Sequence, residues 1–470
     1  MKKIVYILGL LFVVSALSST IMAEDAAIEA ASATVEATTA TEVTSVTEEN
    51  SATIVDGAAL DSGNTAWIIV ATILVMLMTI PGLALFYGGL VRAKNILSII
   101  MQCMVCACVI TIIWVAFGYS WVFGSGFEGS FMFEMIGGFD KVFLRGLTID
   151  TLTDGNIPEI IFAMFQCMFA IITPALMVGA FAERMKFSGF LLFTVLWAIL
   201  AYFPMAHWVW GGGWMMRMGA IDFAGGTVVH INAGISALIM CLMLGKRKSF
   251  ADGRQTPPHN IAFVFIGAAF LWLGWFGFNA GSGLAADGLA ANAFLVTHLA
   301  TAVAAFVWML IDWFLHKKPT TVGICTGAVA GLVAITPAAG TVDVLGAFFI
   351  GATSSIVCFV MVAVVKAKYK YDDSLDAFGV HGIGGLVGSI LTGVFATQVI
   401  SGEGGVQGAL SGDWSQLWIQ IVASAASIAY SATVTFILFY IVDKMVGIRV
   451  NPRVEDEGLD VYEHGETSYS

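Results

Sequence analysis

"GGTVVHINAGISALIM", residues 225–240, belongs to a run from Phe223 to Gly245 that contains no Asp, Glu, Lys or Arg. A charge-free stretch of about 20 residues is long enough to cross a bilayer as a helix. His230 lies inside this run, and an imidazole without partners is costly in hydrocarbon. The stretch therefore predicts a membrane-spanning helix whose histidine is either bonded to a neighbour or part of a pathway.

The composition extends this prediction to the whole chain. Of its 470 residues, 58% are hydrophobic and 11% are charged, whereas a soluble domain has about 25% charged residues. Further uncharged runs of spanning length occupy residues 95–127, 260–286, 288–311 and 414–442. We therefore predict an all-α polytopic membrane protein.

Charge and cysteine content exclude several classes of protein. The net charge is −12 and the sequence has no sizeable basic patch, which argues against a nucleic-acid partner. All seven cysteines lie in apolar segments, where they fit small buried residues better than metal ligands or a disulfide framework. We find no nucleophile–base–orienter triad, no Walker loop and no metal-ligand spacing. The sequence therefore predicts no enzyme, no cofactor and no bound metal.

The first 60 residues differ from the rest. Residues 1–23 have two lysines, the apolar core "IVYILGLLFVVSAL" and then "STIMA", as in a secretory signal peptide cleaved after Ala23. A retained first helix is the alternative. Residues 24–60 are rich in Ala, Thr, Ser, Val and Glu without helical periodicity, so we expect an acidic, disordered periplasmic leader.

From Asn64 onward the pattern predicts eleven spans. They lie near 65–87, 97–123, 158–182, 188–208, 225–244, 260–281, 290–315, 321–338, 343–366, 380–400 and 414–443. With an outer N-terminus, the cytoplasmic segments hold 16 Lys and Arg residues, and the outer loops hold three. This agrees with the positive-inside rule and predicts a membrane domain over 61–445 with a cytoplasmic tail over 446–470.

Eleven spans suggest two inverted halves of five helices and one extra helix. In transporters built this way, the site lies where the halves meet. Spans five and ten each hold a Gly-rich helix with a histidine near its start, His230 and His381. An imidazole ordinarily titrates near neutral pH, so we expect either ring to be able to accept, share or relay a proton. The spacing leaves open whether the two rings meet, and for each a buried histidine bonded to a neighbour is the alternative.

Aromatic residues form a second group of candidates. "HWVWGGGW", residues 207–214, places tryptophans where either an interfacial aromatic belt or a cation–π site would lie. Other candidates share a face of their helices; they are Phe165 and Phe169 in span three, and Trp275, Phe278 and Ser282 in "WFGFNAGS". Helix packing is their alternative role. Asp222 precedes span five, either as a favourable helix N-terminal anion or as a support for an outer cation site.

The motif "DFAGGTVVHINAGISAL" resembles the signature of the ammonium transporter family (Amt/Mep/Rh). The resemblance covers residues 62–470 and continues, in family order, through "PGLALFYGGLVRAKN", "FAIITPALMVGAFAERMKF", "AHWVWGGGW", "GWFGFNAGS", "DDSLDAFGVHGIGGLVG" and "GLDVYEHGETSYS". The paired Phe positions, the outer Trp and the tail fit the bacterial Amt branch. The acidic leader has no counterpart in the family pattern.

The resemblance implies a homotrimer in the inner (plasma) membrane, with one pore in each subunit. The implied roles are ammonium recruitment by Trp210, Ser282, Phe169 and Phe165, a gate of Phe169 and Phe278, pore histidines His230 and His381, and support from Asp222 and Trp275. It also implies that the tail helps to dock a cytoplasmic PII-type regulatory protein.

An apolar pore explains how such a protein would separate ammonium from K⁺, an ion of similar size. Desolvating a bare cation costs several kcal/mol, but ammonium is able to shed its proton. We expect NH₄⁺ to be recruited at the outer site and deprotonated, so that NH₃ passes the histidines and the proton travels separately. The alternative is an ammonium sensor, or transceptor, that signals through its tail. A metalloenzyme would need a third ligand near the two histidines, and a neutral-gas or water channel is a further alternative.

Overall fold

The computed structural model describes residues 59–153, 155–254 and 256–469. The predicted signal peptide (1–23) and all but the last two residues of the predicted leader (24–60) lie outside the described residues. Within those ranges the chain forms helices and two isolated β-bridges, and no strand. Ten of the described helices are long and apolar enough to cross a membrane. The prediction of an all-α polytopic membrane protein is therefore confirmed.

Several spanning helices contain a π-helical turn, and we write them as consecutive elements. The first five are α2 (Ser62–Leu77) with η2 (Met78–Leu83) and α3 (Ala84–Leu90); η3 (Ala93–Asn95) with α4 (Ile96–Ile113), η4 (Trp114–Gly118) and α5 (Tyr119–Phe123); α6 (Glu159–Phe181); α7 (Phe187–Trp197) with η7 (Ala198–Tyr202), α8 (Phe203–Trp210) and α9 (Trp214–Met218); and η8 (Gly226–Ile231) with α10 (Asn232–Leu244).

The later helices follow in the predicted order. They are α12 (Ile261–Gly281), α13 (Gly288–His316), α14 (Thr321–Ile335), α15 (Val344–Phe359) with η9 (Val360–Val365) and α16 (Lys366–Tyr369), η10 (Phe378–Gly382) with α17 (Ile383–Phe395), and α19 (Trp414–Val446). Short elements connect them or follow them; these are η5 (Phe131–Glu134), η6 (Val142–Leu144), α11 (Lys248–Ala251), α18 (Gln398–Ser401), η11 (Ala409–Ser411), α20 (Pro452–Glu457) and η12 (Asp460–His464).

Ten of the eleven predicted spans coincide with these long helices. The other, predicted at 321–338, is α14, which has 15 residues, whereas a helix along the membrane normal needs about 20. α14 stops two residues before Pro337, because proline has no backbone N–H with which to continue the helical hydrogen bonds. The turns that follow it, at 336–340, are buried.

The starts of several spans are fixed by polar side chains just before an apolar run. Asp287, Thr320 and Asp343 each accept a hydrogen bond from the backbone N–H three residues later. Such caps satisfy N–H groups that the first helical turn leaves free. They determine where α13, α14 and α15 begin.

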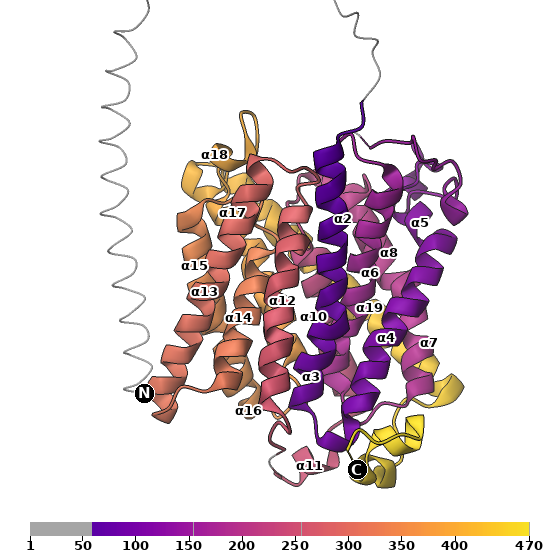
Figure 1. The fold of residues 1–470 in the computed structure, drawn as a ribbon, viewed down its shortest axis with the longest axis vertical. Coiled ribbons are helices and arrows are strands. Elements are labelled where there is room, and N and C mark those ends of the chain that lie inside the picture. Colours follow the sequence, from indigo (N-terminus) through magenta and orange to yellow (C-terminus); the bar gives the residue numbers. More distant parts are fainter. Residues whose placement is uncertain (1–58, 154, 255, 470) are drawn as a thin grey trace, which may run out of the picture. The chain divides into compact units, whose positions relative to one another are not determined.

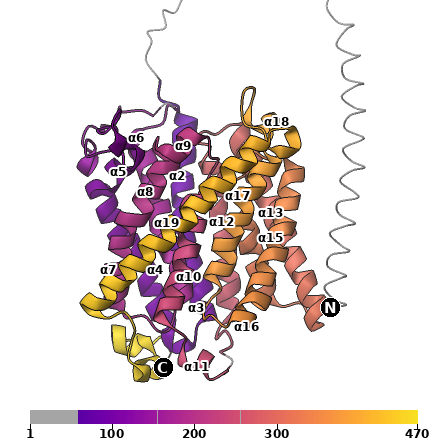
Figure 2. The ribbon, with the colours of Figure 1, turned by 180° about the vertical axis from the view of Figure 1, so that it is seen from behind.

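α19 is polar on its buried face and apolar on its exposed face. Its buried polar residues recur every three or four positions, at Gln416, Gln420, Ser424, Ser427, Ser431 and Thr435. Large apolar residues such as Trp418, Phe436 and Tyr440 are exposed. Figure 2 shows α19 crossing the bundle diagonally, and it packs on α7, α10 and α17. This arrangement suits a helix between protein and lipid, where interhelical hydrogen bonds join the buried faces.

Figure 1 shows α18 and the loops of residues 124–157 at one end of the bundle, which we call the loop end. The opposite end, called the tail end, carries α11, α16 and the C-terminal residues 447–469. The candidate residues lie on a line between these two ends.

Candidate functional site

The two histidine helices begin with the same local structure. The Asp222 carboxylate accepts hydrogen bonds from the backbone N–H groups of residues 225–228, at the start of η8. The Asp373 carboxylate accepts from Ala377 and Phe378 at the start of η10. Each aspartate stands eight residues before its histidine, and in both helices the histidine lies in a π-helical turn. Such turns occur frequently at functional sites.

A glycine contact brings the two helices together. A Cβ on Gly234 of α10 would lie 2.1 Å from the backbone nitrogen of Gly382, so the backbones approach more closely than any other residue would allow. This contact places the imidazoles of His230 and His381 side by side, with 3.3 Å between their Nδ1 atoms and 17° between the ring planes. The question that the sequence left open, whether the rings meet, is answered by the fold.

Trp275 of α12 lies on the other side of His230. Their rings are stacked with centroids 5.4 Å apart, and the Trp275 indole N–H donates to Thr336 Oγ1 at 2.8 Å. His230 is 1% exposed, and its Nε2 atom has no hydrogen-bond partner among the described residues. A buried polar atom without a partner costs free energy, so this nitrogen is a candidate contact for a small polar solute.

Two phenylalanines separate the histidines from the loop end. The rings of Phe169 (α6) and Phe278 (α12) are stacked with centroids 4.2 Å apart. Phe278 is 6.2 Å from the His230 ring. Phe165 contacts Phe169 edge-on at 5.0 Å and is fully buried. The Phe169–Phe278 stack therefore lies between His230 and the loop end.

A cavity of about 190 Å³ opens on the loop-end side of this stack, and Trp210, Ser282, Phe169 and Gln166 are among the residues that line it. The Trp210 indole N–H donates to the Asp222 carbonyl at 2.8 Å, and its ring meets Phe169 edge-on at 5.7 Å. Ser282 Oγ donates to the Phe278 carbonyl at 2.8 Å, which leaves its lone pairs as acceptors. An aromatic face and a hydroxyl oxygen are suitable partners for a small cation with N–H donors.

A second cavity, of about 220 Å³, lies toward the tail end and is lined by His381, Tyr87, Ser374 and Asp376 among others. The Asp376 carboxylate pairs with Lys366 at 2.6 Å. Two cavities therefore flank a segment that contains the Phe169–Phe278 stack and the paired imidazoles.

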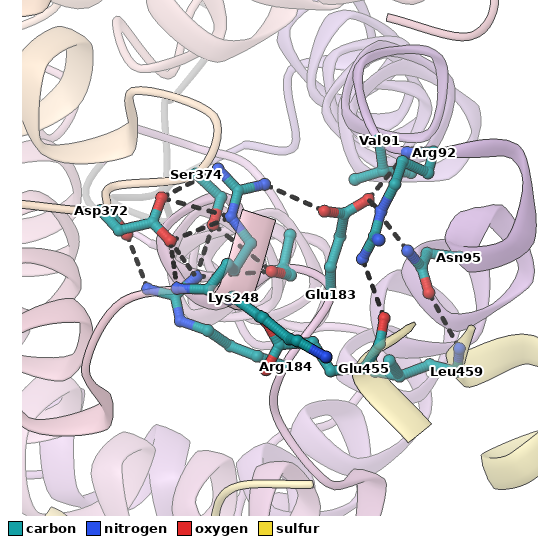
Figure 3. A network of polar contacts seen from close by, with 12 residues as sticks. Val91, Arg92, Asn95, Glu183, Arg184, Lys248, Asp372, Ser374, Glu455 and Leu459 are labelled. Atoms are coloured by element: carbon teal, nitrogen blue, oxygen red, sulfur yellow. Dashed lines mark hydrogen bonds and ion pairs between the residues drawn. The ribbon is translucent and has the colours of Figure 1, made fainter. Parts of the chain in front are cut away.

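Buried ion pairs organise the tail end (Figure 3). Glu183 pairs with Arg92 at 2.9 Å and Arg247 at 3.0 Å, and Arg247 also pairs with Asp372 at 2.8 Å. Burial raises the pKa of the Glu183 carboxyl, but the two arginines lower it more, so the net pKa lies below its ordinary value. The pKa of Asp372 is lowered in the same way against its burial, chiefly by its hydrogen bonds with Arg247.

The C-terminal residues are bound to this network. Lys186 N–H donates to the Ile448 carbonyl at 2.8 Å. Glu455, 3% exposed, accepts from Lys248 N–H at 2.5 Å and pairs with Arg449 at 2.9 Å. Asp460 accepts from the backbone N–H groups of residues 97 and 98, at the start of α4. Residues 447–469 therefore form part of the folded tail end.

The structure thus gathers the predicted residues along one line. Trp210, Ser282 and Phe169 line one cavity, Phe278 and Trp275 lead to His230, and His381 borders the other cavity. Asp222 caps a helix beside them and does not line either cavity. Within the described residues there is no group of three His, Cys, Asp or Glu side chains able to hold a metal ion.

Sequence reasoning missed Asp373, Asp376 and the ion pairs of the tail end. A signal for Asp373 was present, because an aspartate stands eight residues before each histidine. The ion pairs join residues far apart in the chain, such as Glu183 and Asp372 with Arg247, and no local spacing marks them.

Comparisons with known proteins agree on one family. The family model described as Ammonium Transporter Family matches residues 66–469. An ammonium transporter of Bacillus subtilis (strain 168) is 47% identical over 411 residues, which are 87% of this chain and 99% of that protein. The crystal structure of Candida albicans Mep2 has a TM-score of 0.77 and 37% identity, covering 83% of this chain and 87% of that one. A structure titled "Sensor Amt Protein" has a TM-score of 0.78 and 29% identity, covering 86% of this chain and 98% of that one.

Proposed function

Because the chain belongs to the ammonium transporter family, we propose that its line of aromatic and histidine residues is the path along which ammonium crosses the membrane as ammonia. The chain is a multi-pass membrane protein that transports ammonium, and it is a transporter rather than an enzyme. The proposal concerns how the residues described above perform that transport.

Recruitment takes place in the loop-end cavity. NH₄⁺ lies against the Trp210 ring, with Phe169 completing the aromatic wall and Phe165 packed behind Phe169, and donates a hydrogen bond to Ser282 Oγ. Support comes from the cavity of about 190 Å³ that Trp210 and Ser282 share, and from the favourable electrostatics of a cation over an aromatic face. Asp222 supports this site by fixing the segment to which the Trp210 indole is bonded.

The Phe169–Phe278 stack is the gate and the basis of selection. A cation that passes it loses its water in an apolar surrounding, at an idealised cost of order 20 kcal/mol that still amounts to several kcal/mol in real proteins. K⁺ has no means of avoiding this cost. Ammonium avoids it by leaving its proton behind, so NH₃ passes the gate and the proton follows separately.

His230 and His381 accept the ammonia beyond the gate and relay the proton. One observation carries this proposal: two imidazoles lie 3.3 Å apart between two cavities, and one of them has a buried Nε2 without a partner in the described part of the chain. NH₃ both donates and accepts hydrogen bonds, so it pairs with such a nitrogen. Trp275 holds the His230 ring parallel to its own.

The topology follows the charge pattern of the sequence. We propose that the tail end faces the cytoplasm and the loop end the periplasm, in the inner membrane, with α14 as an additional, eleventh crossing. The protein acts as a homotrimer with one path in each subunit. Residues 1–23 act as a signal peptide, 24–60 as a leader, 61–445 as the transport domain, and 446–470 as a regulatory segment that binds a PII-type protein.

Proteoliposomes that contain only this protein test the proposal. A pulse of NH₄⁺ on a solid-supported membrane should give a current, and an equal pulse of K⁺ should give none. A K⁺ current equal to the NH₄⁺ current would refute selection at an apolar gate, and so would the absence of an NH₄⁺ current.

An ammonium sensor that signals through its tail is the second candidate function. The docking of residues 447–469 onto the tail-end network favours it, as does the likeness to the protein titled as a sensor. If signalling were the main output, ammonium would change the exposure of the tail to protease while the purified protein carried no ammonium current.

A further inference from the structure

His207 of α8 is a buried titratable residue without a role in the path described above. It is 0% exposed. Its Nδ1 lies 2.8 Å from the Val122 carbonyl oxygen, at the end of α5, and its Nε2 lies 2.5 Å from the Phe133 carbonyl oxygen in η5. The imidazole thus bridges two segments of the loop end.

Both partners of this ring are acceptors. A carbonyl oxygen has no hydrogen to give, so each contact is a hydrogen bond only if the ring nitrogen carries a proton. A neutral imidazole has one N–H and would leave one carbonyl facing a lone pair, whereas the imidazolium has two N–H groups and satisfies both. Donor counting therefore favours the protonated ring.

The three glycines after Trp210 accommodate this bridge. A Cβ on Gly211 would lie 1.9 Å from the Val122 carbonyl oxygen and 2.6 Å from His207 Nδ1. Gly212 has a φ of +91°, and a Cβ there would be 3.2 Å from the Phe133 ring. Gly211 N–H also donates to the His207 carbonyl at 2.9 Å. The sequence "HWVWGGGW" thus encodes the histidine together with the space that its two acceptors need.

We propose that His207 is a positioning residue of the recruitment site, and that it donates hydrogen bonds from both ring nitrogens, as an imidazolium, to the Val122 and Phe133 carbonyls. This rests on the proposed function, because Trp210, three residues further along α8, lines the recruitment cavity, as does Phe123 beside Val122. The bridge fixes both walls of that cavity relative to each other.

The charged groups on the neighbouring elements pair among themselves. Glu134 of η5 pairs with Arg217 of α9, whose guanidinium lies over the Phe133 ring. Lys141 and Glu159 pair beside Tyr119 of α5. The donors that the Val122 and Phe133 carbonyls face therefore come from the imidazole and not from these side chains.

A double-mutant cycle on ammonium current tests the positioning role. His207→Gln should raise the apparent KM for ammonium about tenfold, as expected for one lost hydrogen bond to a charged group, and change the maximal current little. In a Trp210→Leu background the same change should add no further rise in KM. Met205→Leu, a buried change on α8 away from the cavity, is the control for altered packing. A fall in maximal current at constant KM, or KM effects that multiply in the double variant, would overturn the proposal.

The protonation state is measured without transport. In ¹⁵N-histidine-labelled protein, the ring signals that vanish in His207→Gln belong to His207. Under the conditions of the transport assay both of its ring nitrogens should carry protons, because both contacts are to carbonyl acceptors. A singly protonated ring under those conditions, alongside a normal wild-type KM, would refute the proposal. A wild type without ammonium current would instead refute the proposed function, while the ¹⁵N signals would still decide whether the bridge exists.

Discussion

Replacing either helix-capping aspartate by asparagine should destabilise the protein, and Asp222→Asn should do so about twice as much as Asp373→Asn. The Asp222 carboxylate accepts four backbone N–H groups, from residues 225–228 at 2.5–3.0 Å. The Asp373 carboxylate accepts two, from residues 377 and 378. Asparagine has one acceptor oxygen where aspartate has two, so two N–H groups lose their partner in the first variant and one in the second.

The magnitude follows from these counts. A hydrogen bond to a charged group contributes about 1.5–3 kcal/mol, so Asp222→Asn should cost about 3–6 kcal/mol and Asp373→Asn about 1.5–3 kcal/mol. Burial and the neighbouring Asp376 raise the pKa of Asp373 to about 6. Burial raises the pKa of Asp222 as well, so the expected difference between the two variants rests on their hydrogen-bond counts.

Thermal unfolding of the two purified variants in detergent, measured beside wild type, is the assay for this pair. Asp222→Asn should show the larger fall in midpoint, because its carboxylate accepts twice as many backbone hydrogen bonds. An equal fall for both variants, or a larger one for Asp373→Asn, would refute the hydrogen-bond reasoning.

Three further predictions concern the helix crossing and the tail end. Gly234→Ala should destabilise the protein by about 1–3 kcal/mol through overpacking and reduce ammonium current, whereas Gly288→Ala, where a Cβ meets nothing within 4 Å, should do neither in the same assays. Glu455→Gln should make the C-terminal residues more sensitive to limited proteolysis, and unchanged cleavage would contradict their docking. Because the pKa values of Glu183 and Asp372 are lowered, their contribution to stability should be kept as the pH falls to about 4 and be lost only below that pH. A loss of thermal stability that begins at pH 6 and is caused by protonation of these two carboxylates would argue against this prediction.

The spans were predictable because a helix in hydrocarbon has to be long and uncharged, and each such stretch is visible in the local sequence. The pairing of His230 with His381 was not, since 150 residues separate them and a close contact between Gly234 and Gly382, which only the fold brings together, decides the crossing. The resemblance of motifs identified the candidate residues, but not that Phe165 stands behind Phe169 rather than on the cavity wall.

The limits of the spans were predicted less well, for local reasons. Residues 321–338 met the composition of a span, yet Pro337 ends the helix early. Counting charged residues could not reveal the polar face of α19, because serine, threonine and glutamine are uncharged. From this face, the Gln420 side chain forms hydrogen bonds with both the N–H and the carbonyl of Ile221 at 2.8 Å. These two bonds hold the segment just before Asp222.

The most direct test of the account is the current of the double variant His230→Ala with His381→Ala, recorded with NH₄⁺ and then K⁺ on the same membrane. If the paired imidazoles relay the proton through an otherwise apolar path, the NH₄⁺ current should disappear, or ammonium should no longer be favoured over K⁺. A double variant that keeps the full wild-type current and the full discrimination against K⁺ would contradict the account.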